Sequence, residues 1–164
     1  MATVKTYGLK KISSAEVSAD GTMPAVLEEL CQTYRDSCEF TEDDPQITDE
    51  YSDQEDDPIQ TFAIKGAKSI KFSTFDYSPE LLVKLKGGTV VNGQWAEPAV
   101  MPEIYQAIEL LTNTDLPFHF PKCRVIAKFN TKLVKNGLSL LEITLRPQSP
   151  GPGKPAVLIG KKTP

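Results

Sequence analysis

The sequence predicts a mainly β protein: an antiparallel β-sandwich or partly closed barrel of about seven or eight strands, with one short flanking α-helix and a long acidic loop. Three observations favour this class. Short runs of alternating apolar and polar residues recur along the chain, separated by Gly, Pro and Asn. Asn-Gly pairs at residues 92–93 and 136–137 are typical of hairpin turns. Only the segment near Pro79 combines helix start and stop signals.

The length and composition favour one domain. The chain has 164 residues, of which 40% are apolar, enough for a single core. We expect residues 1–146 to form the β domain and the Pro/Gly-rich residues 147–164 to form a tail with little regular structure. The sequence has no run of about 18 apolar residues, and its start lacks the apolar segment of a secretion signal. We therefore expect neither membrane insertion nor export.

The first third of the domain gives mixed signals. Residues 4–12 predict an opening strand with an irregularity at a glycine, and Asp20-Gly21 predicts a turn. Residues 25–34 carry apolar side chains at helical spacing, whereas residues 34–40 alternate like a strand. The type of element therefore stays open there.

A pair of strands is predicted after the acidic segment. Residues 60–64 and 69–75 are joined by a short turn at residues 65–68. In the second strand Ile70 and Phe72 share one face, and polar residues occupy the other, so we expect one buried and one wet face.

The short helix has the best-defined ends. Ser78 suits the N-cap, Pro79 suits the first helical position, and Glu80 suits the positive first turn. Gly87-Gly88 provides the left-handed stop. A helix this short needs support from packing. The residues expected to dock it on the sheet are Leu81, Leu82 and Leu85.

The remaining strands follow at short intervals. The sequence predicts a hairpin at residues 89–95 and strands at residues 104–111, 116–120, 124–129 and 138–145. Pro121 should end the second of these single strands, because proline cannot donate to a ladder. The core candidates of the last strand are Leu138, Leu140, Ile143 and Leu145.

Charge is distributed very unevenly. Residues 39–57 contain ten of the 22 acidic residues, and no Lys or Arg lies between Asp36 and Ile64. The rest of the chain has 18 basic and 12 acidic residues, a charge of +6. We interpret residues 39–58 as an acidic loop that is solvated or disordered, or that docks on a basic surface of a neighbouring copy or repels nucleic acid. The candidate assembly residues are Glu42, Asp43, Asp44, Asp49, Glu50, Asp53, Glu55, Asp56 and Asp57.

No motif for catalysis or cofactor binding stands out. His119 is the sole histidine, and the phenylalanines on either side of it should point to the opposite face. Cys31, Cys38 and Cys123 lack the close pair spacing of zinc sites. Gly87-Gly88 follows a helix, whereas a phosphate site needs glycines before one. We therefore expect no catalytic residue, no metal and no cofactor, and a protein that is not an enzyme.

The order of these elements is similar to that of a known family. Residues 76–90, Asp-Tyr-Ser-Pro-Glu-Leu-Leu-Val-Lys-Leu-Lys-Gly-Gly-Thr-Val, resemble the bacteriophage major tail tube proteins, in which a strand leads into an Asp-x-x-Pro-Glu helix and a Gly-Gly-Thr hairpin. Residues 70–73 fit the preceding strand, residues 120–130 the strand before the final hairpin, and residues 143–147 the closing strand. The resemblance extends over residues 4–150.

The resemblance implies a function by assembly. It implies hexameric rings whose sheets join into an inner barrel, stacked into a tube through which DNA passes without specific binding. The implied partners are further copies of the chain and other tail proteins, with no membrane. The implied location is the virion tail, after synthesis in the bacterial host cytoplasm.

Two alternatives remain at the level of the sequence. One is the inner-tube protein of a contractile injection or type VI-like secretion system, which shares the fold by resemblance. The other is a monomeric β-sandwich binding module, for which Trp95, Tyr77 and Tyr105 offer stacking surfaces.

Overall fold

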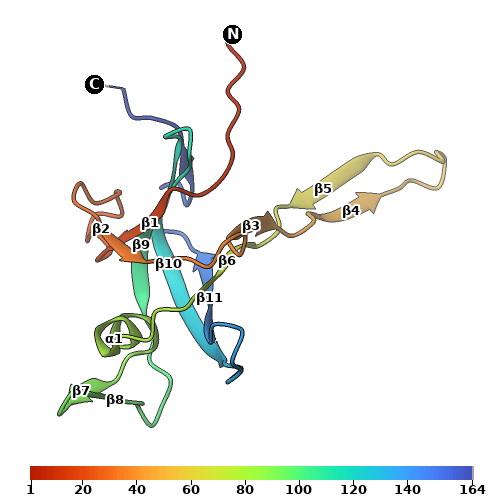
Figure 1. The fold of residues 1–164 in the computed structure, drawn as a ribbon. Helices are drawn as coiled ribbons and strands as arrows, with labels where there is room; N and C mark the ends of the chain where they lie inside the picture. Colours follow the sequence, from red (N-terminus) through yellow and green to blue (C-terminus); the bar gives the residue numbers. More distant parts are fainter. Residues whose placement is uncertain (164) are drawn as a thin grey trace.

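The computed structural model describes residues 1–163 and has the mainly β architecture that the sequence predicts (Figure 1). The strands of the main sheet are β1 (Lys11–Ala15), β2 (Glu28–Cys31), β3 (Glu39–Glu42), β6 (Lys68–Thr74), β9 (Tyr105–Leu111), β10 (Pro117–Asn130), β11 (Leu140–Pro147) and β12 (Leu158–Ile159). All pairings are antiparallel, in the order β2-β1-β9-β10-β11-β6-β3, and β12 pairs with β10. The order begins with β2 and ends with β3, and the chain directly after β2 bridges to β6 at Thr33 and Thr74, so the sheet curls back on itself and is partly closed.

Three elements lie outside this sheet. Two are hairpins, β4 (Gln46–Glu50) with β5 (Gln60–Ile64), and β7 (Thr89–Val91) with β8 (Gln94–Ala96). The third is the helix α1 (Pro79–Lys86). In the described part of the chain no helix is long and apolar enough to cross a membrane.

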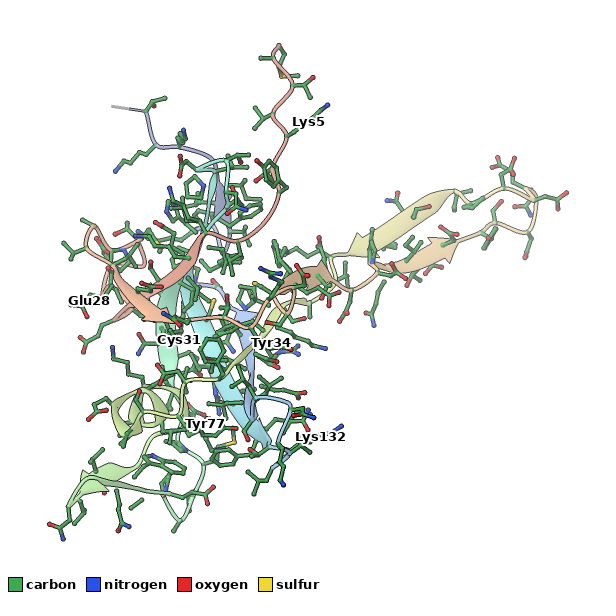
Figure 2. The ribbon with its side chains drawn as sticks, in the orientation of Figure 1. Lys5, Glu28, Cys31, Tyr34, Tyr77 and Lys132 are labelled. Carbon is green, nitrogen blue, oxygen red and sulfur yellow. The ribbon has the colours of Figure 1, made fainter. Side chains whose placement is uncertain are left out.

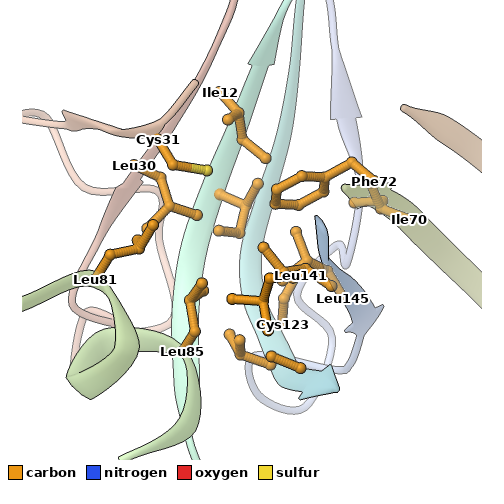
Figure 3. Close-up of a cluster of buried hydrophobic side chains, with 14 of the residues drawn as sticks. Ile12, Leu30, Cys31, Ile70, Phe72, Leu81, Leu85, Cys123, Leu141 and Leu145 are labelled. Carbon is orange, nitrogen blue, oxygen red and sulfur yellow. The ribbon is translucent and has the colours of Figure 1, made fainter. Parts of the chain in front are cut away.

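The core lies against the main sheet, and α1 packs onto it over β10 (Figure 3). The alternation predicted for β6 is confirmed, because Ile70 and Phe72 are buried and Lys71 between them is exposed. At the β3 edge, the ring of Phe40 packs edge-on against Phe120, with 5.1 Å between centroids. The body therefore has its own apolar core, built from strands distant in sequence.

The predicted helix is confirmed, with a different cap from the expected one. Ser78 makes no side-chain cap hydrogen bond; instead its backbone N–H donates to Asp76 Oδ1 at 3.0 Å. At the other end Gly87 and Gly88 have φ values of 78° and 89°, as a left-handed stop requires. Leu81, Leu82 and Leu85 are buried in the core cluster.

The first predicted hairpin turn is also confirmed. Asn92 and Gly93 both have positive φ, 52° and 77°, which is the type I′ geometry. Trp95 on β8 is half-buried, and its Nε1–H donates to the carbonyl oxygen of Gly87 at 2.8 Å. The indole therefore ties the hairpin to the end of the helix.

Several predicted boundaries and pairings are wrong. The first strand begins at Lys11, so residues 4–10 are not a strand. Pro121 does not end a strand: β10 continues to Asn130, with an irregular register between Phe120 and Cys123 that accommodates the missing N–H. The ambiguous residues 25–34 contain the strand β2.

The predicted pairing of residues 60–64 with residues 69–75 is wrong as well. β5 pairs with β4, and β6 lies between β11 and β3. The acidic segment contains two strands, β3 and β4. β4 pairs with β5 and β3 pairs with β6, so the turn at residues 65–68 does not close a hairpin. Two strands on either side of a short turn therefore belong to different sheets.

The C-terminal third departs from prediction at two points. Leu138 is exposed, and β11 begins only at Leu140, so its buried residues are Leu141, Ile143 and Leu145. The tail also contains regular structure, because β12 pairs with β10 at Phe118 and His119, past the point where β11 ends. The tail therefore extends the sheet along β10.

Candidate assembly surface

The acidic segment forms an arm that projects from the body (Figure 1). We define the arm as residues 46–64: β4, the tip at residues 51–59, and β5. This is more regular than the predicted loop, since five residue pairs, from Gln46 with Ile64 to Glu50 with Gln60, are in register. All ten residues of β4 and β5 are exposed, so neither strand packs on the body.

Both faces of the arm carry unburied apolar side chains. Directly opposed residues in an antiparallel pair share a face, so Phe62 and Ile64 lie on one face and Ile47 on the other. Ile47 is 64% exposed, Phe62 56% and Ile64 66%. A two-stranded hairpin alone is at best marginally stable in water, because it has no core. The arm thus has the surface of an element that lacks its packing partner.

The base of the arm is fixed by close backbone contact. The N–H of Asp43 donates to the carbonyl oxygen of Ala67 at 2.9 Å, which extends the β3–β6 ladder by one residue. A Cβ at Gly66 would overlap the carbonyl of Asp43, so this approach requires glycine. Lys68 Nζ lies 3.4 Å from Glu42 Oε1 across the same pair of strands. The arm therefore leaves the body from a defined point.

The candidate assembly carboxylates are gathered on and beside the arm, and all are exposed. Glu42 ends β3, Asp43 and Asp44 link β3 to β4, and the other six lie on β4 or at the tip. Only Glu42 forms an ion pair within the described residues. Asp49 accepts a hydrogen bond from Thr61 Oγ1 at 2.6 Å across the strands. The arm therefore combines uncompensated negative charge with exposed apolar side chains.

A second exposed surface was missed by the sequence reasoning. The loop between β10 and β11, residues 131–139, contains Lys132 and Lys135 and no acidic residue. Leu133 is 89% exposed, and Val134 and Leu138 are also exposed. We call residues 131–139 the basic loop. The Asn136-Gly137 pair indicated a turn here, but placing Leu138 in the core hid the run of apolar side chains around it.

The titratable groups elsewhere have structural roles. His119 Nε2 lies 2.8 Å from Glu109 Oε2, with both side chains largely covered. Burial raises the pKa of Cys31 and Cys38 to about 11 and that of Cys123 to about 12, so these thiols stay protonated and unreactive near neutral pH. Across residues 1–163 no group of three or more His, Cys, Asp or Glu side chains is placed to hold a metal.

An open groove of about 850 Å³ lies between the N-terminal segment and the connection from β2 to β3. Its lining includes Tyr7, Tyr34, Phe40 and Phe118, with Arg35 and Asp36 at its exposed rim and the protonated Cys38 thiol. The groove presents aromatic and apolar surface, and it brings together no nucleophile with a base.

The comparisons add no relative. No family model matches this chain, and no curated protein matches it.

Proposed function

We propose that this chain is the structural subunit of a bacteriophage tail tube, which assembles with copies of itself into stacked hexameric rings that conduct DNA. The observation that carries the proposal is the arm: a preformed β-hairpin whose apolar side chains are exposed and whose carboxylates form no ion pair among residues 1–163. A protein that functions alone has no evident use for an unsupported hairpin, because such an element is marginal and exposes sheet edges.

Three further features support assembly. Among the described residues the end strands of the main sheet, β2 and β3, each pair with one strand only, which leaves a row of backbone N–H and C=O groups on the other side. The body and the arm have opposite charge, so copies attract each other in a head-to-tail sense. The order of strand, Pro-Glu helix and Gly-Gly hairpin is the one shared with the tail tube proteins.

The stacking residues suggested for a binding module have other contacts. The indole N–H of Trp95 donates to the carbonyl oxygen of Gly87, and the Tyr77 hydroxyl donates to the carbonyl oxygen of Leu140 at 2.7 Å. Tyr105 lies beneath the charged ends of Lys122 and Arg124. These aromatic side chains hold the body together, which favours the assembly proposal over ligand stacking.

The test is the state of association of the purified chain. Sedimentation velocity over a range of protein concentrations, followed by negative-stain electron microscopy of the most concentrated samples, should give ring-sized species and hollow tubes. A strictly monomeric chain at every concentration, at low and moderate salt, would contradict the proposal.

A further inference from the structure

The basic loop has the complementary chemistry to the arm. Its lysines form no ion pair in the described part of the chain, and its three apolar side chains contact solvent. The arm offers carboxylates with Ile47, Phe62 and Ile64. The arm and the basic loop therefore complement each other: each carries the charge opposite to the other's, and each has apolar side chains that the other can cover.

The basic loop is held at its base as firmly as the arm is. The Tyr77 hydroxyl lies 2.8 Å from Thr131 Oγ1 and also donates to the carbonyl oxygen of Leu140, so it joins the two ends of the loop. Inside the loop, Ser139 Oγ donates to the carbonyl oxygen of Lys132 at 3.1 Å. The ring of Phe129 packs against Tyr77 and Trp95 just before the loop begins. A fixed base lowers the ordering cost of a contact made by the loop.

The two surfaces of one copy do not meet. The arm extends away from the body, whereas Lys132 lies at the far end of β10, next to the side of the molecule that carries α1 and Tyr77 (Figure 2). Both are joined to the same main sheet, the arm through β3 and β6 and the basic loop through β10 and β11, and they leave it at separate places. Any contact between them must join different copies.

We propose that the basic loop of one copy receives the acidic arm of the next, with Lys132 and Lys135 facing the arm carboxylates and Leu133, Val134 and Leu138 covering its apolar side chains. This inference rests on the proposed function and names the surface through which copies join. Because the two patches are different and distant, the contact is heterologous and leaves a free arm and a free loop at its ends. Such a contact propagates into rings or filaments.

The combination of charge and apolar area favours an arm over nucleic acid as the occupant of the loop. A phosphate backbone would neutralise the two lysines but leave Leu133, Val134 and Leu138 in water. The arm covers both kinds of group in one contact. Its carboxylates also give the encounter a long-range attraction that salt weakens.

The experiment reverses the charges on each side. One variant carries Lys132→Glu and Lys135→Glu in the basic loop; a second carries Asp56→Lys and Asp57→Lys at the tip of the arm. A control, Lys84→Glu with Lys162→Glu, makes the same change in net charge as the loop variant, at exposed positions outside both surfaces. The concentration at which each protein assembles is measured by sedimentation velocity and negative-stain microscopy, and circular dichroism checks that each remains folded.

We expect each reversed variant alone to need at least about tenfold more protein to assemble, because like charges then face each other. The control should assemble like the parent. An equimolar mixture of the two variants should regain assembly, because Lys-bearing arms then meet Glu-bearing loops and the original arms meet the original loops. The chain that carries all four substitutions should regain it as well.

Different failures identify different errors. If the parent assembles and the loop variant assembles equally well, this contact is overturned while the proposed function stands. Reversed variants that lose assembly without rescue by mixing overturn the direct pairing of arm and loop. Unchanged assembly with loss of binding to a DNA duplex would assign the loop to nucleic acid. A parent that never assembles removes the proposed function itself.

Discussion

Removing the arm should leave the body folded and abolish assembly. The β3–β6 ladder shows where to cut, because Asp43 and Ala67 already face each other through the hydrogen bond at 2.9 Å. Replacing residues 44–66 with Asn-Gly joins them by a two-residue type I′ turn, the connection that matches the twist of paired strands. No arm residue belongs to the core cluster, so the deletion removes no buried apolar contact.

The expected change in stability follows from the length of the connection. The entropic free-energy cost of closing a loop changes by about (3/2)RT times the logarithm of the ratio of the lengths. Shortening a flexible link from roughly 23 residues to two therefore lowers this cost by up to ~2 kcal/mol. This is an upper value, since the arm is itself partly ordered by its own ladder. The free energy of unfolding should therefore stay the same or rise by up to ~2 kcal/mol, with little change in denaturant slope, because the arm exposes little new surface on unfolding.

The free energy of unfolding is measured by urea denaturation, with circular dichroism as the signal. The protein concentration is kept low enough that association does not add to the stability of the parent. Sedimentation velocity and electron microscopy of concentrated samples then compare assembly. A loss of more than about 2 kcal/mol would show that the arm packs on the body and refute its description as an unsupported element. Tubes formed by the armless chain would refute its role in assembly.

Two further predictions concern the body. Replacing Leu82, which is 6% exposed, with Ala should lower the free energy of unfolding by about 2–5 kcal/mol, and replacing it with Asp should lower it further. The control Lys84→Ala, on the exposed side of α1, should change it by no more than about 0.5 kcal/mol. Equal urea midpoints for Leu82→Ala and Lys84→Ala would show that this helix face is not packed. The thiols of Cys31, Cys38 and Cys123 have folded-state pKa values raised from 9.0 to about 11 or 12. Their contribution to stability is complete below pH 9 and is lost as the pH rises toward 11, because the unfolded chain releases those protons first. Urea midpoints measured from pH 8 to pH 10.5 should therefore fall, and Ellman's reagent should label the native thiols slowly and the unfolded ones fast.

The sequence predicted correctly those elements that depend only on residues close together in the chain: one helix, one turn and the alternation of one strand. The helix at Pro79–Lys86 has its start and stop within ten residues, and the turn at Asn92-Gly93 needs only its own backbone preferences. The alternation of Ile70 and Phe72 likewise depends on one strand alone. These features could be predicted because no distant residue decides them.

Pairing between strands could not be predicted in the same way. β5 pairs with β4, and the tip at residues 51–59 joins them. The density of carboxylates in this segment predicted an unstructured loop instead of a strand. The irregular register of β10 depends on β9, which lets Pro121 sit inside a long strand. The start of β11 depends on where β10 ends, so Leu138 was assigned to the core although it lies on the basic loop. The acidic residues of the candidate assembly surface were found from composition, and the basic loop was not, because its charge is too small to stand out.

The carboxylates of the arm can serve two purposes at once. Its strands have free edges and exposed apolar side chains, which is the usual setting for uncontrolled pairing between copies. Negative charge along the arm makes two arms repel, so arm-to-arm pairing carries a penalty, whereas an arm and a basic loop attract. The same residues thus disfavour the wrong contact and favour the right one. Because the hairpin is already formed, little ordering is left to oppose that contact. Neutralising the carboxylates to amides should therefore raise disordered aggregation as it lowers ordered assembly, and not simply weaken association.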